Sequence, residues 1–87
     1  NRYLVPALER GLRLLQLFDR TRTDIAPPDI ARELDLPRST VFRLLQTLEY
    51  LGCVERGASG AYHLGPGVLR LGFEYLASLE VSDVARP

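Results

Sequence analysis

The chain has 87 residues, of which 46% are hydrophobic, and a formal net charge of zero at pH 7. This length corresponds to one small domain with a single hydrophobic core, too small for a large enzyme cleft. The sequence contains no apolar run near the length of a membrane span and no signal-peptide pattern, and its one cysteine excludes an internal disulfide or a multi-cysteine metal site.

The charges are unevenly distributed along the chain. Residues 1–22 carry a net charge of +3 and residues 23–37 carry −3, whereas residues 38–56 carry +1 and residues 57–87 carry −1. A net charge of zero counts against a simple electrostatic DNA-binding protein, in which a basic excess is typical. If the chain binds DNA, we expect the acidic stretch to face away from it and the non-specific affinity to be modest.

The first predicted helix runs from about Pro6 to Arg20. Its expected buried face consists of Leu8, Leu12, Leu15 and Phe18. Three further leucines widen the apolar surface, which either a broad core contact or a partner surface would explain; they are Leu4, Leu14 and Leu17. Arg10 and Arg13 lie on the more polar side, either as solvated charges or as contacts to a DNA backbone.

A polar connection over residues 21–24 leads to Ile25-Ala26, which we expect to form a brief strand. Pro27-Pro28 then opens a second helix that runs through about Leu34, because proline is well tolerated in a first helical turn. The predicted inward side chains of this helix are Ile30, Ala31 and Leu34. It would support the helix that follows.

The segment Leu34–Leu51, LDLPRSTVFRLLQTLEYL, has the pattern of the turn and second helix of a helix-turn-helix. After the break Asp35-Leu36-Pro37, with Pro37 suited to a first helical turn, apolar residues recur at the spacing of a core-facing stripe: Val41, Leu44, Leu45 and Leu48. The other side offers arginines, hydroxyls and an amide near a helix N-terminus, which suit phosphate oxygens and base edges in a major groove. These candidate DNA contacts are Arg38, Ser39, Thr40, Phe42, Arg43 and Gln46. An amphipathic helix with a solvated polar face is the alternative.

A short hairpin is predicted after this helix, with Gly52 as the helix cap. Residues 53–56 alternate as one strand, residues 57–60 form a turn, and residues 61–64 form the return strand. A hairpin directly after a recognition helix is the wing of a winged helix. Arg56 and Ser59 would then touch the sugar-phosphate backbone or the minor groove, although Ser59 would also fit a solvent-exposed hairpin tip.

A fourth helix is predicted from about Pro66 to Leu79. It is apolar on more sides than a surface helix of a monomer needs, so we expect part of it to contact the first helix of another copy or a following domain. The apolar residues are Val68, Leu69, Leu71, Gly72, Phe73, Tyr75, Leu76 and Leu79. The predicted domain covers residues 1–80, with a dimerisation or linker helix from about residue 66, and residues 81–87 begin a link to a further domain.

The sequence contains no Walker loop, dinucleotide fingerprint, hydrolase G-x-S-x-G motif or zinc-ligand spacing. We interpret His63 as a structural or wing-edge residue and Cys53 as a small core residue. Asp29, Glu33 and Asp35 are interpreted as a solvated face rather than an acid–base pair. We therefore expect no enzymatic activity, no cofactor and no metal in this chain.

Three segments resemble the N-terminal domain of IclR-type bacterial transcription regulators. They are ALERGLRLLQLFD, IARELDLPRSTVFRLLQTLEYLGCVER and YHLGPGVLRLGFEYLASLEVSDVARP, which occur in the order and spacing of that family. The resemblance implies a mainly α fold with a small β-hairpin, that is, a winged helix-turn-helix followed by a long C-terminal helix. It also implies binding to double-stranded operator DNA and a C-terminal domain that senses a small organic effector. The chain starts at Asn1 and contains no methionine, so we expect a piece of a longer protein. We expect a cytoplasmic location, and the single cysteine fits a reducing compartment.

The resemblance also implies roles for individual residues. Ser39, Thr40 and Arg43 would face the groove. Arg38 and Arg10 would approach the DNA backbone, and Arg56 would serve the wing. The first and fourth helices would carry the contacts of a homodimer or higher homo-oligomer. The motifs LERGL, FD and LGFEYLASLEVSDVARP most resemble the subgroup that controls aromatic-acid catabolism.

Two features depart from the family pattern. Asp35 stands in the turn where glycine is common, and Pro27-Pro28 replaces the more usual serine or threonine cap.

A winged helix that contacts proteins and not DNA is the alternative function, and the zero net charge and the apolar fourth helix favour it. The Ser-Thr-x-x-Arg face and the Arg-bearing wing favour DNA, as would a basic, concave face that joins the candidate arginines.

Overall fold

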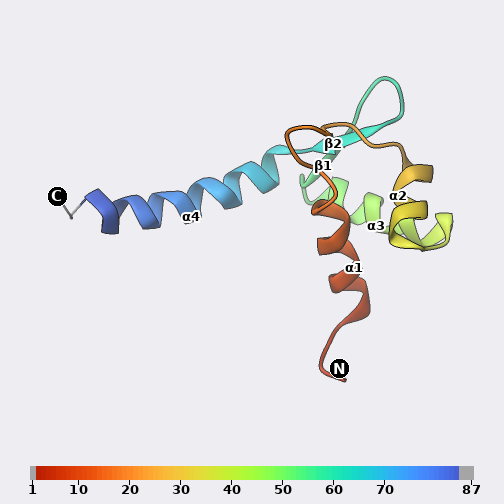
Figure 1. The fold of residues 1–87 in the computed structure, drawn as a ribbon, viewed down its shortest axis with the longest axis horizontal. Helices are drawn as coiled ribbons and strands as arrows, with labels where there is room; N and C mark the ends of the chain where they lie inside the picture. Colours follow the sequence, from red (N-terminus) through yellow and green to blue (C-terminus); the bar gives the residue numbers. More distant parts are fainter. Residues whose placement is uncertain (1, 85–87) are drawn as a thin grey trace.

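The computed structural model describes residues 2–84, with side chains for residues 2–79. The elements in chain order are α1 (Pro6–Leu15), α2 (Pro27–Leu34), α3 (Arg38–Tyr50), β1 (Val54–Arg56), β2 (Tyr62–Leu64) and α4 (Pro66–Val84). Three short helices and a hairpin pack together, and α4 projects away from them (Figure 1). The predicted fold class is confirmed. Over the described residues, no helix combines the length and apolar character needed to cross a membrane.

The hydrophobic core lies between α1, α2, α3 and the hairpin. α3 contributes Val41 and Leu45, which are four residues apart, lie on one side of the helix and are each 1% exposed. Buried residues from the other elements complete the core: Leu14, Phe18, Ile25, Ile30, Ala31, Val54 and Tyr62. Leu44 and Leu48 are only partly buried at its edge. The core-facing stripe predicted for α3 is therefore confirmed at its centre.

The first helix is shorter than predicted. α1 ends at Leu15, five residues before the expected end at Arg20. The Asp19 carboxylate accepts hydrogen bonds from the backbone N–H and the hydroxyl of Thr21, at 2.8 and 2.7 Å. These bonds stabilise a tight turn in place of further helix, since a short aspartate side chain competes with the helical pattern for backbone donors.

The buried face predicted for the first helix is wrong at two of its four positions. Leu8 and Leu12 are 61% and 51% exposed, whereas Leu14 is fully buried and Gly11 is buried. Phe18 is buried as expected, and Leu15 is half-buried. Because leucines occur around most of α1, the spacing alone did not determine which side packs inward.

The turn between α2 and α3 depends on a left-handed residue. α2 has the predicted bounds, and Asp35 at its end has φ 55° and ψ 50°. This conformation allows the backbone N–H of Leu36 to donate to the carbonyl oxygen of Ala31 at 3.0 Å. Left-handed residues are usually glycine, and aspartate is among the few others that tolerate the region. Pro37 then lies just before the first turn of α3 rather than inside it.

The hairpin is antiparallel, with Val54 opposite Leu64, Glu55 opposite His63 and Arg56 opposite Tyr62. Each strand is one residue shorter than predicted. Tyr62 also exchanges two backbone hydrogen bonds of 2.9 Å with Ile25, which confirms a brief strand contact at that residue. The wing is thereby joined to the loop that precedes α2.

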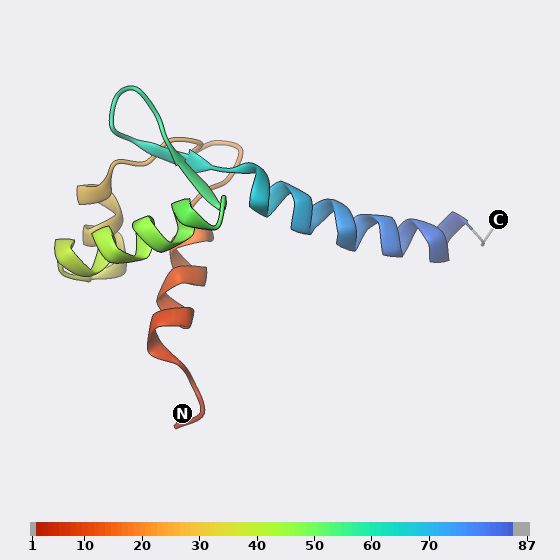
Figure 2. The ribbon, with the colours of Figure 1, turned by 180° about the vertical axis from the view of Figure 1, so that it is seen from behind.

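Glycines make the junction between α3 and α4 very close. Gly52 has φ +80° and ends α3 as predicted, with its N–H donating to the carbonyl oxygen of Glu49. Gly67 N–H donates to the carbonyl oxygen of Gly52 at 2.7 Å, and a β-carbon at Gly65 or Gly67 would collide with the Gly52 carbonyl group. This junction directs α4 away from the core, as Figure 2 shows from behind.

The fourth helix is longer than predicted. α4 continues to Val84, past the expected end at Leu79 and through Ser82, where a link was expected. The rest of that link, residues 85–87, lies outside the described residues. From Leu69 to Leu79 every residue of α4 is exposed, including Leu71 at 74% and Tyr75 at 64%.

We expect Asp35→Gly to be more stable than Asp35→Ala by about 1 kcal/mol, because alanine is strained in the left-handed region and glycine is not. Asp35→Asn should remain close to the wild type, since asparagine tolerates this region as aspartate does. Urea denaturation followed by circular dichroism would measure the differences. Equal stability of the glycine and alanine variants would contradict a left-handed residue at this turn.

Candidate nucleic-acid interface

The outer face of α3 carries most of the predicted DNA contacts. Ser39, Arg43 and Gln46 are exposed, and Phe42 is 60% exposed, while Thr40 is half-buried at the edge of this face. Their position follows from the core, because Val41 and Leu45 turn inward and hold the opposite side of the helix toward solvent. The face offers a cation, two hydroxyls, an amide and an aromatic ring.

The N-terminus of α3 is also accessible. Pro37 occupies the cap position, and no side chain makes a capping hydrogen bond there. The N–H groups of the first helical turn have no partner inside a helix, so they remain available to an anion. Arg38 is exposed in this first turn, which adds a positive charge beside the free N–H groups.

Arg10 of α1 and Arg43 of α3 line the same cleft. The cleft has a volume of about 290 Å³, and its other lining residues are Ala7, Thr40, Leu44 and Thr47. Two arginines from separate helices therefore line one concavity beside the outer face of α3. The structure thus brings Arg10, Thr40 and Arg43 together, whereas Arg38 and Arg56 are not among the residues of this cleft.

The wing holds Arg56 and Ser59 at the surface. Both are exposed, and the Ser59 hydroxyl oxygen lies 3.4 Å from the backbone N–H of Ala61, which donates to it. His63 lies lower on the hairpin, with Nε2 3.2 Å from a Glu55 carboxylate oxygen and Nδ1 3.7 Å from one of Asp24. His63 therefore lies between the hairpin and the loop before α2. Cys53 is half-buried.

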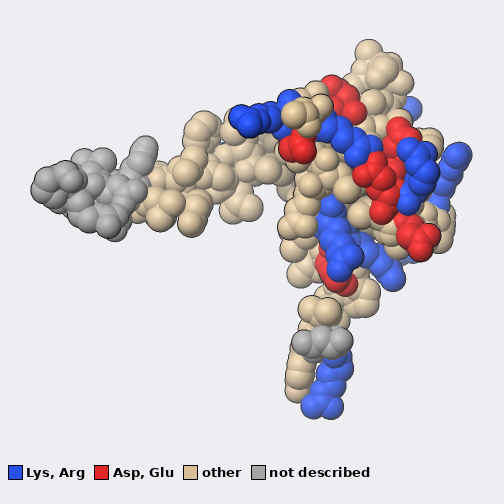
Figure 3. Space-filling view, viewed as in Figure 1, with Lys and Arg blue, Asp and Glu red and all other residues tan. Residues whose placement is uncertain are grey.

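Ion pairs with arginine involve two of the four carboxylates of the acidic stretch and, over the described residues, none of the candidate arginines. Asp29 pairs with Arg32 at 2.6 Å, and Glu33 pairs with Arg22. In Figure 3 acidic and basic side chains accordingly lie next to each other over α2 and the loop that leads into it. Within residues 2–79, by contrast, no ion pair involves the four candidate arginines, namely Arg10, Arg38, Arg43 and Arg56.

Two carboxylates that hold the loop before α2, those of Asp19 and Glu33, have lowered pKa values. A hydrogen bond from the Arg22 guanidinium lowers the pKa of Glu33, and the same contact raises the pKa of Arg22. Hydrogen bonds from the Thr21 hydroxyl and backbone N–H lower the pKa of Asp19. The loop is therefore held most firmly when these carboxylates are ionised.

Tyr50 is absent from the predicted set, although the structure puts it on the same side of α3. It is 88% exposed and follows Gln46 by four residues and Arg43 by seven, so the three side chains form one stripe. The helical spacing that indicates Gln46 also indicates Tyr50, which lies one turn further along α3.

In this helix-turn-helix the second helix, α3, exposes one face, its arginines have no ion pair among the described residues, and a hairpin follows it. This is the architecture of winged-helix DNA-binding domains. Residues 7–58 match the family model described as the IclR helix-turn-helix domain. The chain therefore belongs to the IclR family of DNA-binding transcription regulators.

Individual relatives agree with this assignment. The HTH-type transcriptional repressor AllR of Salmonella paratyphi A is 40% identical over 82 residues, which are 93% of this chain and 30% of AllR. An IclR family transcriptional regulator from Brucella abortus has a crystal structure that superposes with a TM-score of 0.86 at 41% identity, over 100% of this chain and 34% of that one. An IclR homolog from Microbacterium hydrocarbonoxydans, complexed with 4-hydroxybenzoate, gives 0.70 at 35% identity, over 75% and 27%. This chain thus spans about a third of the length of these relatives.

We expect Glu33→Gln to lower the melting temperature slightly at pH 7, because it removes the ion pair with Arg22. A carboxylate with a lowered pKa stabilises the fold above its ordinary pKa, 4.5 for Glu33, and loses this effect as the pH falls through the lowered value. The difference between variant and wild type should therefore shrink below about pH 4.5 and vanish in stronger acid. Thermal denaturation from pH 7 to pH 2 would measure it.

Glu74→Gln is a suitable control, since Glu74 is exposed on α4 and has no ion pair within the described residues. A deficit of Glu33→Gln that persisted unchanged at the acid end would show that the ion pair does not cause it.

Proposed function

We propose that this chain reads operator DNA for a one-component transcription regulator that responds to a small molecule. The observation that carries the proposal is the outer face of α3, where Ser39, Arg43 and Gln46 are exposed and no ion pair of the described residues involves Arg43. These side chains can donate hydrogen bonds to base edges in the major groove and accept hydrogen bonds from them. α3 would enter that groove, as recognition helices do.

Contacts to phosphate would position α3 in the groove. Arg38 and the free N–H groups at the start of α3 suit one phosphate, and Arg10 suits another at the rim of the cleft it shares with Arg43. Arg56 would contact the backbone from the wing. With so few cations, the affinity for DNA of unrelated sequence should be modest, and base contacts should provide much of the discrimination.

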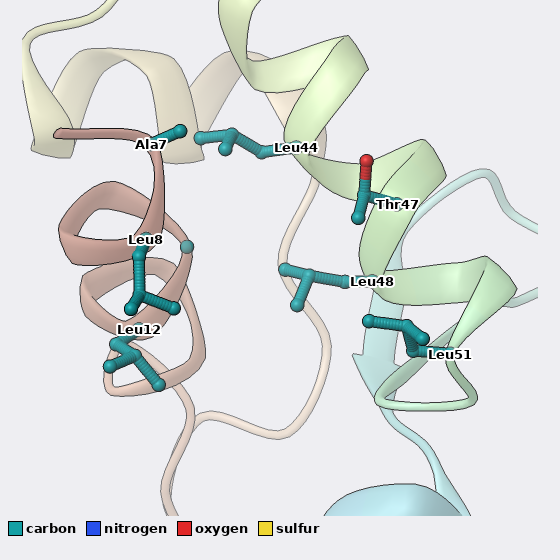
Figure 4. Close-up of a pocket in the computed structure, with 8 residues that line it drawn as sticks. Ala7, Leu8, Leu12, Leu44, Thr47, Leu48 and Leu51 are labelled. Atoms are coloured by element: carbon teal, nitrogen blue, oxygen red, sulfur yellow. The ribbon is translucent and has the colours of Figure 1, made fainter. Parts of the chain in front are cut away.

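The protein would bind DNA as a dimer through α1 and α4. An apolar groove of about 260 Å³ separates α1 from α3, and its lining residues are Ala7, Leu8, Gly11, Leu12, Leu44, Thr47, Leu48 and Leu51 (Figure 4). α4 presents exposed Leu69, Phe73 and Leu76 and leaves the core without covering this groove. Insertion of α4 from a second copy would bury both surfaces, which are costly to leave in water.

A second domain after α4 would bind the effector. The support for this part of the proposal is that the chain spans only about a third of its relatives, one of which was crystallised with 4-hydroxybenzoate. An aromatic acid is accordingly the effector class that we propose. The protein would act in the cytoplasm, where its DNA is, and would carry no enzymatic activity.

We expect Arg43→Ala to weaken binding to the operator by roughly 1–3 kcal/mol, the contribution of a bidentate arginine–guanine contact. Fluorescence anisotropy with DNA from upstream of the protein's own gene, at two salt concentrations and against scrambled DNA, would measure the loss. Arg32→Ala is the matched control, because it removes the same charge from a residue already paired with Asp29. Equal losses for the two variants would exclude Arg43 as a base contact.

We expect Leu12→Glu to convert the dimer to a monomer, because it adds a carboxylate to the apolar groove between α1 and α3. Light scattering after size-exclusion chromatography of the 87-residue chain would report the mass. Gln16→Glu adds the same charge to an exposed position just beyond α1, outside the groove, and should leave the dimer intact. A dimer that survives Leu12→Glu would mean that this groove is not the contact surface.

A further inference from the structure

One exposed residue of α3 has no role in the core or in the groove between α1 and α3. The Phe42 ring is 60% exposed and does not belong to the hydrophobic core cluster. It is also absent from the residues that line the apolar groove and the cleft shared by Arg10 and Arg43. A phenyl ring therefore stands largely exposed on the recognition helix.

The neighbours of Phe42 indicate which surface would cover it. Phe42 lies three residues after Ser39 and four before Gln46, so these side chains are adjacent on the outside of α3. Arg38 lies one turn before Phe42 and Arg43 directly after it. A ring flanked by two cations, a hydroxyl and an amide faces an environment suited to DNA more than to an apolar protein surface.

The base edges in a major groove offer very little apolar surface. Guanine, adenine and cytosine present hydrogen-bond donors or acceptors there, and a phenyl ring placed over them would remove their water without replacing the hydrogen bonds. Thymine is the exception, because its C5-methyl group projects into the groove. A ring that enters the groove is therefore matched by a thymine and penalised by the other bases.

We infer that Phe42 contacts the C5-methyl group of a thymine in each operator half-site and makes that position specific. The inference rests on the proposed function and adds to it the identity of one base. The thymine lies within about two base pairs of the bases reached by Ser39 and Gln46, because one helical turn advances 5.4 Å and one base step 3.4 Å.

Deoxyuridine differs from thymine only by the missing methyl group, so it tests this contact directly. In the footprinted operator of the full-length protein, each thymine of both half-sites is replaced in turn by deoxyuridine, and the dissociation constant is measured. For the wild type we expect one position per half-site at which the affinity falls about fourfold, the effect of removing one methyl group from an apolar contact. Replacement at the other thymines should change little.

The same series with Phe42→Ala completes a double-mutant cycle. This variant should bind the thymine operator more weakly than the wild type and lose all sensitivity to deoxyuridine at the identified position. Phe42→Leu, which keeps an apolar side chain, should retain part of the sensitivity. Since Phe42 is exposed, both variants should keep the wild-type circular dichroism spectrum and dimer mass.

The outcomes separate the inference from the function on which it rests. If the wild type binds the operator no better than scrambled DNA, the proposed function fails and the inference fails with it. If the operator is bound but no thymine is sensitive, or if Phe42→Ala remains as sensitive as the wild type, only the thymine contact is overturned. Loss of dimer mass in Phe42→Ala would instead assign the ring to a protein contact.

Discussion

The burial of Val41 and Leu45 determines how α3 is presented to its surroundings. Both side chains are 1% exposed, in a cluster with Leu14 of α1 and Ile30 of α2. A helix held so firmly on one side cannot rotate without losing apolar contacts, since protein interiors are close-packed. The orientation of Ser39, Phe42, Arg43 and Gln46 is therefore a consequence of packing, and the contacts that support it come from residues far away in the sequence.

A net charge of zero is compatible with DNA binding here because of how the charges are paired. The two acidic residues of α2, Asp29 and Glu33, are matched by Arg32 and Arg22, so half of the carboxylates in the negative stretch are paired within the domain. The arginines around α3 have no such partners among the described residues and remain available to phosphates. The formal net charge adds the paired charges of α2 to the unpaired arginines around α3. The local distribution of charge therefore says more about DNA binding than the net charge does.

Two apolar surfaces of the chain are exposed to solvent. The close glycine junction at Gly52 and Gly67 sends α4 outward, where its leucines and aromatic rings stay exposed. The same direction leaves the groove formed by Leu8, Leu12 and Leu48 uncovered. A dimer would bury both surfaces and would also set the distance between two recognition helices, which links the geometry of α4 to the spacing of operator half-sites.

The sequence by itself determined the bounds of α2, the position of α3 and the hairpin, because local signals mark them: Pro27-Pro28 at one start, Gly52 at an end, and apolar residues at helical spacing along α3. It also identified the turn at Asp35 as unusual. Only the tertiary structure decided that Leu14 and not Leu12 faces the core, that α1 ends at Leu15, and that Arg10 shares a cleft with Arg43. The physical reason is that α1 has leucines on most of its sides, so its local pattern fits several orientations. The choice between them comes from packing against α2 and α3, whose partners are distant in the chain.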